Sequence, residues 1–276
     1  MNKQTKQTES VEVNAVNNAV EKSKALVKDK AKLTFQPTLK KRVMTIEIYR
    51  FDPDKDPKPY MKTYQIDLAH VTGKMLLNAI EFIRETQDPT IGVRRSCGEG
   101  VCGSDGMNIN GVNGLACITQ LAELPDQVKL RPLPGFPVVR DLIVDMTNFY
   151  RQYEKVKPYL MNDEARPTKE RLQSPAERRK LDGLYECILC ACCTSSCPSY
   201  WWNPDKFIGP AGLLTAYRFV ADSRDTETKQ RLEALKDPFS LFRCRSIMNC
   251  ASVCPKNLNP TRAIQKLRAK MINESV

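Results

Sequence analysis

The chain has 276 residues, 41% of them hydrophobic, which is long enough for two modest domains with buried cores. Its formal net charge is +11, yet no aromatic-studded basic stripe or nucleic-acid motif accompanies that charge, so we expect no nucleic-acid partner. No stretch approaches the ~18 apolar residues of a membrane-spanning helix. Eleven cysteines lie in tight groups, and the first 40 residues contain no apolar signal segment. Both features favour metal binding in a reducing compartment over disulfides.

The first 38 residues differ from the rest of the chain. They are rich in Lys, Asn, Gln and Thr and contain no glycine. This composition predicts a mobile tail over residues 1–38, with one helical stretch near 20–27. No arginine precedes Arg42 and several acidic residues are present, which argues against a mitochondrial transit peptide.

Residues 39–145 predict a small α+β domain. Met44, Ile46 and Ile48 alternate with residues that face the other way, as in a half-buried strand. The expected strands are at 43–48, 64–68 and 128–131, with a loop at 52–59 and turns that fill 98–114. A helix is expected at 73–86, with Thr72 as its cap. Its buried stripe is Leu76, Ala79, Ile80 and Ile83. Strands around one helix, with a cysteine loop after the helix, form a small α+β domain.

Residues 146–276 predict a second, helical domain. A helix is expected at 144–153, and Ser174 with Glu177 forms a capping box that opens another. Asn259-Pro260 opens the last helix, whose expected buried stripe is Ala263, Ile264, Leu267 and Met271. No internal repeat is evident.

The first cysteine set lies in a glycine-rich loop. Cys97, Cys102 and Cys117 match the plant-type two-iron ferredoxin pattern except that Asp105 stands where a cysteine is usual. We expect the Asp105 carboxylate to bind one iron of a [2Fe–2S] cluster; the alternative is that Asp105 is merely solvated. Zinc held by the same four residues fits the glycine loop less well.

The second set is a bacterial-ferredoxin run. Cys187, Cys190, Cys193 and Cys197, followed by Pro198, have the spacing in which the fourth cysteine serves a different cluster from the first three. Cys192 falls outside this spacing and is expected to be a small buried thiol.

The third set repeats that spacing with one cysteine missing. Cys244 and Cys250 take the first and third places, Cys254-Pro the fourth, and Ile247 the second. Exchanging the fourth ligands gives one cluster with four thiolates and one with three, hence [4Fe–4S] and [3Fe–4S]. The four-iron set is Cys187, Cys190, Cys193 and Cys254, and the three-iron set is Cys197, Cys244 and Cys250. Fewer thiolates predict a higher reduction potential for the three-iron cluster.

These motifs resemble the iron–sulfur subunits of succinate dehydrogenase, respiratory complex II. The likeness covers residues 39–272 and extends to the missing cysteine at Ile247, and the aspartate form of the first loop is one that bacterial members use. The resemblance implies an α+β fold: an N-terminal β-grasp, plant-type [2Fe–2S] ferredoxin domain followed by an all-helical bacterial-ferredoxin-like domain.

The resemblance also implies partners and a place in respiration. A flavoprotein carrying FAD oxidises succinate, as in the tricarboxylic acid cycle. Electrons then pass through [2Fe–2S], [4Fe–4S] and [3Fe–4S] to ubiquinone, with one or two membrane-anchor subunits that often hold haem b. The chain would lie on the cytoplasmic face of a bacterial inner membrane, or on the matrix side of the mitochondrial inner membrane. No succinate-binding residues are expected on it.

A tryptophan pair beside the three-iron ligands acquires a role from the resemblance. Trp202 is expected to donate its indole N–H to a quinone carbonyl, with Pro198, Trp201 and Ile247 nearby. Packing alone remains the alternative, above all for Trp201. Arg245 stands where the family often has histidine. A permanently charged guanidinium does not shuttle protons, and the single histidine, His70, lies far from the clusters in sequence.

Three alternative functions remain open from the sequence. Quinol:fumarate reductase has the same architecture and differs in direction. A free-standing multi-cluster ferredoxin is disfavoured by the three clusters, the tryptophan pair and the basic charge. A structural zinc protein would lack the brown colour and the stoichiometric acid-labile sulfide of an iron–sulfur protein.

Overall fold

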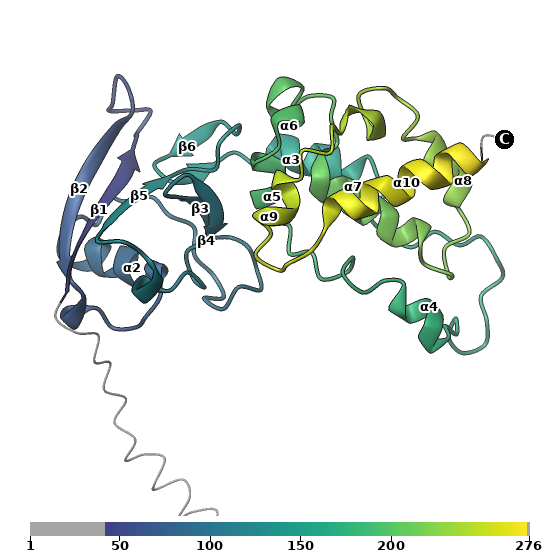
Figure 1. Cartoon of the computed structure of the whole chain (residues 1–276), viewed down its shortest axis with the longest axis horizontal. Coiled ribbons are helices and arrows are strands. Elements are labelled where there is room, and N and C mark those ends of the chain that lie inside the picture. Colours follow the sequence, from purple (N-terminus) through teal and green to yellow (C-terminus); the bar gives the residue numbers. More distant parts are fainter. Residues whose placement is uncertain (1–41, 275–276) are drawn as a thin grey trace, which may run out of the picture. The chain divides into compact units, whose positions relative to one another are not determined.

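The computed structural model describes residues 42–274. The expected tail and its helical stretch near 20–27 lie outside this range. Within it, the strands lie between residues 43 and 144, and the helices from α3 onward follow residue 146 (Figure 1).

A five-stranded mixed sheet forms the first half. Its strand order is β2-β1-β5-β3-β4, with β1 and β5 parallel and every other neighbouring pair antiparallel. The strands are β1 (Val43–Arg50), β2 (Tyr60–Asp67), β3 (Gly106–Ile109), β4 (Val112–Leu115) and β5 (Gln127–Arg131). Helix α2 (Leu76–Thr86) lies beside this sheet in Figure 1.

The alternation in β1 has the predicted effect. Met44, Ile46 and Ile48 have no exposed surface, and they share one core with the buried stripe of α2. Burying each such side chain contributes about 1.5–3 kcal/mol to folding, which is why the pattern alone identifies the strand.

Helix α2 begins at Leu76, three residues later than predicted, so Thr72 is not its cap. The segment before it is extended and held by a distant loop: Met75 forms a β-bridge with Gln120, and the Leu76 amide donates to the Thr119 carbonyl. The Met75 amide in turn donates to the Asn78 side chain at 3.1 Å, which closes the first turn.

The prediction that turns fill residues 98–114 was wrong for its second half. Strands β3 and β4 form a hairpin there, joined by Asn110-Gly111, both with positive φ (50° and 90°). Two positive-φ residues are what a tight hairpin turn requires.

Shorter elements complete the first half. These are the 3-10 turns η1 (Leu68–His70) and η2 (Leu121–Glu123), and a separate two-stranded sheet of β6 (Val138–Arg140) and β7 (Ile143–Val144). Val144 therefore ends a strand, whereas the sequence predicted a helix there. Helix α3 (Thr147–Glu154) begins after Asp145, whose carboxylate accepts a hydrogen bond from the Thr147 amide at 2.8 Å.

The second half consists of short helices separated by irregular segments. They are α4 (Pro175–Arg179), α5 (Cys192–Ser195), α6 (Pro198–Trp202), α7 (Gly209–Val220), α8 (Thr228–Glu233), the 3-10 turn η3 (Leu241–Arg243), α9 (Asn249–Ser252) and α10 (Pro260–Glu274). The capping box is confirmed: the Ser174 amide donates to Glu177 Oε2 at 2.8 Å, and the Glu177 amide donates to Ser174 Oγ at 3.3 Å. Helix α10 begins at Pro260 as predicted, packs against α7, and buries its expected stripe. None of the helices between residues 42 and 274 is both long and apolar enough to span a bilayer.

Candidate iron–sulfur sites

The first cysteine loop directs backbone amides at a sulfur. Cys97 Sγ accepts from the amides of Glu99, Val101 and Cys102 at 3.5, 3.4 and 3.3 Å. The loop reaches this shape through three glycines with positive φ, at positions 98, 100 and 103. Amides aimed at sulfur stabilise a thiolate, and with it the negative charge of a bound cluster.

Asp105 is buried in this loop rather than solvated. Its side chain is 3% exposed, and its Oδ2 accepts a hydrogen bond from the Cys117 amide at 2.5 Å. Burial, followed by the hydrogen bond and charge of Asp105, raises the pKa of the Cys117 thiol to about 12. The solvated alternative for Asp105 is therefore wrong, while ligation of iron by Asp105 stays a prediction.

The pKa of the Cys102 thiol is shifted in the opposite direction from that of Cys117. The Ser104 hydroxyl and then its backbone amide lower the pKa of the Cys102 thiol to about 6. Cys97 and Cys117 line one hollow with Gly98, whereas Cys102 lines a second with Gly103 and Cys190. Cys102 is thus the cysteine of the first set that lines a hollow together with a cysteine of the second.

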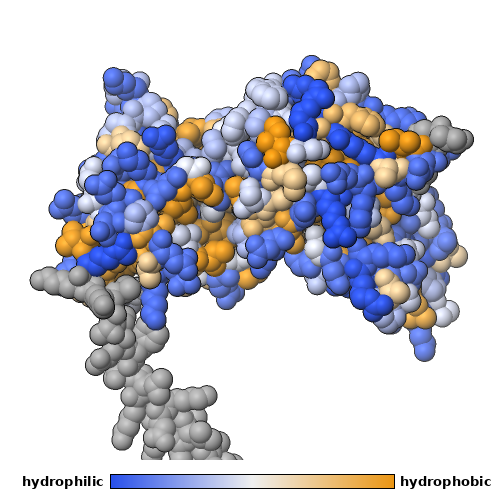
Figure 2. Space-filling model, viewed as in Figure 1, coloured by the Kyte–Doolittle hydropathy of each residue, from blue (hydrophilic) through white to orange (hydrophobic). Residues whose placement is uncertain are grey.

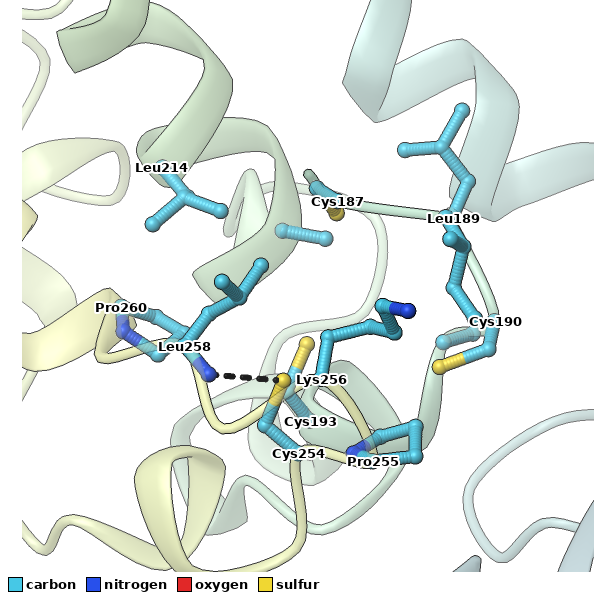
Figure 3. Close-up of a pocket in the computed structure, with 13 residues that line it drawn as sticks. Cys187, Leu189, Cys190, Cys193, Leu214, Cys254, Pro255, Lys256, Leu258 and Pro260 are labelled. Carbon is cyan, nitrogen blue, oxygen red and sulfur yellow. Dashed lines mark hydrogen bonds between the residues drawn. The ribbon is translucent and has the colours of Figure 1, made fainter. Parts of the chain in front are cut away.

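The four residues predicted to hold [4Fe–4S] surround one cavity. Cys187, Cys190 and Cys193 come from one segment and Cys254 from another, as exchange of the fourth ligands requires (Figure 3). The rest of the lining is mainly apolar and includes Leu189, Leu214 and Leu258. The Leu258 amide donates to Cys254 Sγ at 3.4 Å, drawn as the dashed line in Figure 3. A cavity lined by four thiols and apolar side chains, with an amide that donates to sulfur, fits a cluster.

The three residues predicted to hold [3Fe–4S] line another cavity together. Cys197, Cys244 and Cys250 are joined there by Ile247, Pro198 and Arg245. The Ser246 amide donates to Cys244 Sγ at 3.4 Å, and the Thr261 hydroxyl lies 3.2 Å from Cys250 Sγ. Ile247 faces the same space as the three thiols, which fits a cluster that lacks a fourth ligand.

The two cysteine runs share a backbone conformation. Leu189 and Ala191, which flank Cys190, have φ of 53° and 62°. The residues that flank Ile247, Ser246 and Met248, have φ of 56° and 72°. Within each run, a short helix begins directly after the second positive-φ residue: α5 after Ala191 and α9 after Met248. Ile247 thus occupies the place of Cys190 in the repeated run, as the cysteine spacing predicted, and the shared positive-φ pattern extends the likeness to the backbone.

Burial raises the pKa of several thiols in the second half and so favours their protonated form. It raises the pKa of Cys187 to about 11 and raises the pKa of Cys193, Cys197 and Cys250 in the same direction. The pKa of Cys190 is lowered, first by a hydrogen bond from Cys192. Since iron binds thiolates, cluster insertion must displace protons from these sites.

Cys192 is buried, as expected for the spare thiol. It has no exposed surface, and its Sγ lies 3.7 Å from the Gly114 carbonyl of β4. In the described part of the chain, no three His, Cys, Asp or Glu residues converge on a single metal ion.

The two tryptophans differ in their contacts. Trp201 donates its indole N–H to the Ser195 carbonyl at 2.6 Å and lies against Gly135. Trp202 is 61% exposed, with the Arg243 guanidinium 5.8 Å from its ring. Neither is among the residues that line the three-iron cavity. Trp202 is the more exposed of the two, since Trp201 is 45% exposed.

Comparison with known proteins agrees with the geometry. Family models described as a 2Fe-2S iron-sulfur cluster binding domain and a 4Fe-4S dicluster domain match residues 45–151 and 186–259. A Coxiella burnetii protein named succinate dehydrogenase iron-sulfur subunit is 69% identical over 232 residues, 84% of this chain and 98% of that protein. A Paracoccus denitrificans protein of the same name is 50% identical over 85% of this chain and 90% of its own length.

The chain belongs to the succinate dehydrogenase iron–sulfur subunit family. As a member of that family it has an iron–sulfur electron-transfer role in an oxidoreductase complex, so the predicted function class is confirmed. A chain of the Mycobacterium smegmatis Sdh1 complex in the apo form has the same fold, with a TM-score of 0.75 at 23% identity, over 85% of this chain and 98% of that one. The predicted α+β fold, with a 2Fe–2S domain before a 4Fe–4S domain, is confirmed.

Proposed function

We propose that this chain carries electrons singly from a succinate-oxidising flavoprotein subunit to ubiquinone at a membrane anchor. The observation that carries the proposal is the cavity lined by cysteines from two distant segments, Cys187–Cys193 and Cys254. The proposed ligand sets are Cys97, Cys102, Asp105 and Cys117 for [2Fe–2S]; Cys187, Cys190, Cys193 and Cys254 for [4Fe–4S]; and Cys197, Cys244 and Cys250 for [3Fe–4S].

The protein's own groups give each site its character. When bound, each cluster supplies a centre that accepts and releases one electron. Amides on Cys97, Cys244 and Cys254 stabilise negative charge, which favours the reduced state. The third site has one thiolate fewer because Ile247 replaces a cysteine, so its potential is expected to be the higher of the two sites in the second half. That order directs electrons toward the third site.

The surface beside the third site fits an anchor. Several large apolar side chains are exposed there: Trp201, Trp202, Phe239, Phe242, Ile247 and Met248. Arg243 lies over the rings of Trp202 and Phe239, and Arg268 over Phe242. Figure 2 shows hydrophilic residues over much of one face of the chain, with apolar patches between them. Exposed aromatic rings under cations suit contact with an apolar partner at an anionic membrane surface, here the cytoplasmic face of an inner membrane, with Trp202 at the ubiquinone.

Two cysteine substitutions test the ligand assignment in the assembled complex. Cys254→Ser is expected to abolish the four-iron electron paramagnetic resonance (EPR) signal and retain the three-iron signal, although Cys254 follows the third run. Cys192→Ser is the matched control, and all three signals should persist. Loss of the three-iron signal in Cys254→Ser, with the four-iron signal intact, would refute the exchanged assignment.

A further inference from the structure

The loop of the first cluster site rests directly on the backbone of the second site. A Cβ added at Gly103 would lie 2.7 Å from Cys190 Cβ, 2.9 Å from Cys190 Cα and 2.9 Å from the Ile188 carbonyl oxygen. No real Cβ tolerates such contacts, and none of these atoms is the end of a flexible side chain. The two segments therefore touch with no side chain between them.

A second glycine extends the contact. A Cβ at Gly106 would lie 3.0 Å from the Cys190 carbonyl oxygen. Beside it, the buried Asn113 side chain donates to the Cys192 carbonyl at 3.1 Å, so β4 is fixed to the same segment. Cys102 and Cys190 also line a common hollow. Gly103, which follows the proposed [2Fe–2S] ligand Cys102, thus contacts Cys190, a proposed ligand of the [4Fe–4S] cluster.

We propose that Gly103 is a positioning residue that sets the separation of the [2Fe–2S] and [4Fe–4S] clusters, and hence the rate of electron transfer between them. This rests on the ligand sets proposed above. In that step the first cluster is oxidised and the second reduced by one electron, with no bond made and no proton moved. A methyl group at Gly103 would push the two loops apart, and the rate falls as the separation grows.

The loop supplies its own control. Gly98 and Gly103 have nearly equal φ, 73° and 71°, so alanine at either position meets the same backbone strain. At Gly98, however, an added Cβ has no atom within 4 Å. The difference between Gly98→Ala and Gly103→Ala therefore isolates the steric contact with Cys190. Gly106→Ala has no positive φ to oppose it and a milder contact, so it should give an intermediate effect.

The test uses EPR of the assembled complex with both clusters reduced. A nearby second spin speeds relaxation of the first, so the microwave power that half-saturates the [2Fe–2S] signal reports their separation independently of activity. We expect this power to fall several-fold in Gly103→Ala, less in Gly106→Ala, and not at all in Gly98→Ala. Rapid mixing with succinate and freeze-quenching measure the rate of electron transfer from the first to the second cluster. This rate should be lowered most in Gly103→Ala, less in Gly106→Ala and not in Gly98→Ala.

The proposal would be overturned if the [2Fe–2S] signal half-saturates at the same microwave power in Gly103→Ala and Gly98→Ala while the signals of both clusters are intact. If Gly103→Ala does not assemble, Gly106→Ala decides, and saturation like the wild type there would also overturn it. A wild-type complex without a [2Fe–2S] signal would instead refute the ligand sets, and so is distinguishable from failure of the spacing argument.

Discussion

Ile247 is the residue on which the iron content of the third site depends. It lines the cavity between two positive-φ residues, in the place that Cys190 holds in the second run. A thiolate there would complete a fourth corner. We expect Ile247→Cys to convert [3Fe–4S] to [4Fe–4S] and to lower its potential, because the added thiolate brings negative charge. EPR of the oxidised protein would show the three-iron signal lost. A wild type that lacks this signal when prepared anaerobically would contradict the assignment.

Lys256 places a positive charge at the second site. It lines the [4Fe–4S] cavity two residues after Cys254, and Figure 3 shows its side chain among the cysteines. A cation stabilises the more negative, reduced state. We expect Lys256→Gln to lower the potential by tens of millivolts, since ~59 mV corresponds to a tenfold equilibrium change for one electron.

Redox titration of the four-iron signal measures this shift. Lys129→Gln, on β5 of the first half, is the control for loss of one positive charge and should leave the potential unchanged. An unchanged potential in Lys256→Gln would show that solvent screens this ammonium group.

At the scale of elements, a buried ionic network joins the end of β1 to the segments that follow α2 and β6. Arg50 is 6% exposed and donates to Asp88 at 2.6 Å and to Asp141 at 2.9 Å. Tyr64 and Lys62 also donate to Asp88. We expect Arg50→Met to destabilise the chain by about 3–5 kcal/mol, because it removes the buried cation that these two carboxylates share. Urea unfolding measures this loss. Lys129→Met breaks an exposed pair with Glu47 in the same sheet and should cost less than about 1 kcal/mol.

The same network makes stability depend on pH. Burial alone would raise the pKa of Asp88, but the hydrogen bonds donated by its neighbours outweigh burial and hold the pKa far below its usual range. A carboxyl group with a depressed folded-state pKa stabilises the fold above its unfolded pKa of about 3.9, and this contribution is lost as pH falls further toward the folded pKa. Acid titration of the wild type should therefore show stability falling below pH ~4. No acid-dependent loss in that range would contradict a native-state role for ionised Asp88.

The elements that the sequence predicted are those whose signal is local. Met44, Ile46 and Ile48 identify β1 because one face is buried, and Pro260 marks the start of α10 because proline suits the first helical turn. Strand β3 was missed since Gly106–Ile109 has little strand propensity of its own and is held by pairing with β5, where Ile109 lies opposite Leu130.

The features of the candidate sites that the sequence predicted are likewise the local ones. Cysteine spacing groups the proposed ligands, because each run is a local loop, and the structure brings each group in the second half together around its own cavity. The contact of Gly103 with Cys190 joins two loops from different halves of the chain, and no spacing within either loop encodes it. The burial of Asp105 also depends on distant packing, so the sequence left its solvated alternative open.

At the scale of the whole molecule, the chain is one part of an electron path. Its sequence shows no flavin fingerprint, and we predict that the succinate site lies on a partner subunit. Expressed without partners, it should give cluster signals in EPR but no succinate-dependent dye reduction. Dye reduction by the purified chain alone would overturn its assignment as a subunit that only transfers electrons.

The exit of electrons to quinone is expected at Trp202. Its ring is exposed at the end of α6, the helix that begins directly after the proposed three-iron ligand Cys197, whereas the Trp201 indole is hydrogen-bonded to the Ser195 carbonyl. One hydrogen bond to a quinone carbonyl is worth about 1–2 kcal/mol, and removing the indole also leaves the pocket misshapen. We therefore expect Trp202→Ala to lower quinone reductase activity by about tenfold or more, since ~1.4 kcal/mol is a tenfold change.

Three measurements separate this role from packing. Succinate oxidation with an artificial acceptor near the flavin should be retained in Trp202→Ala, because that chemistry lies upstream, and all three cluster signals should persist. Leu172→Ala, which truncates another highly exposed apolar side chain, is the control and should leave both activities unchanged. Trp201→Ala should instead lower stability, because its indole bonds to Ser195 and covers Gly135. If both activities of Trp202→Ala fall together with intact clusters, or quinone reduction is untouched, Trp202 serves packing and the quinone site lies on the anchor subunits.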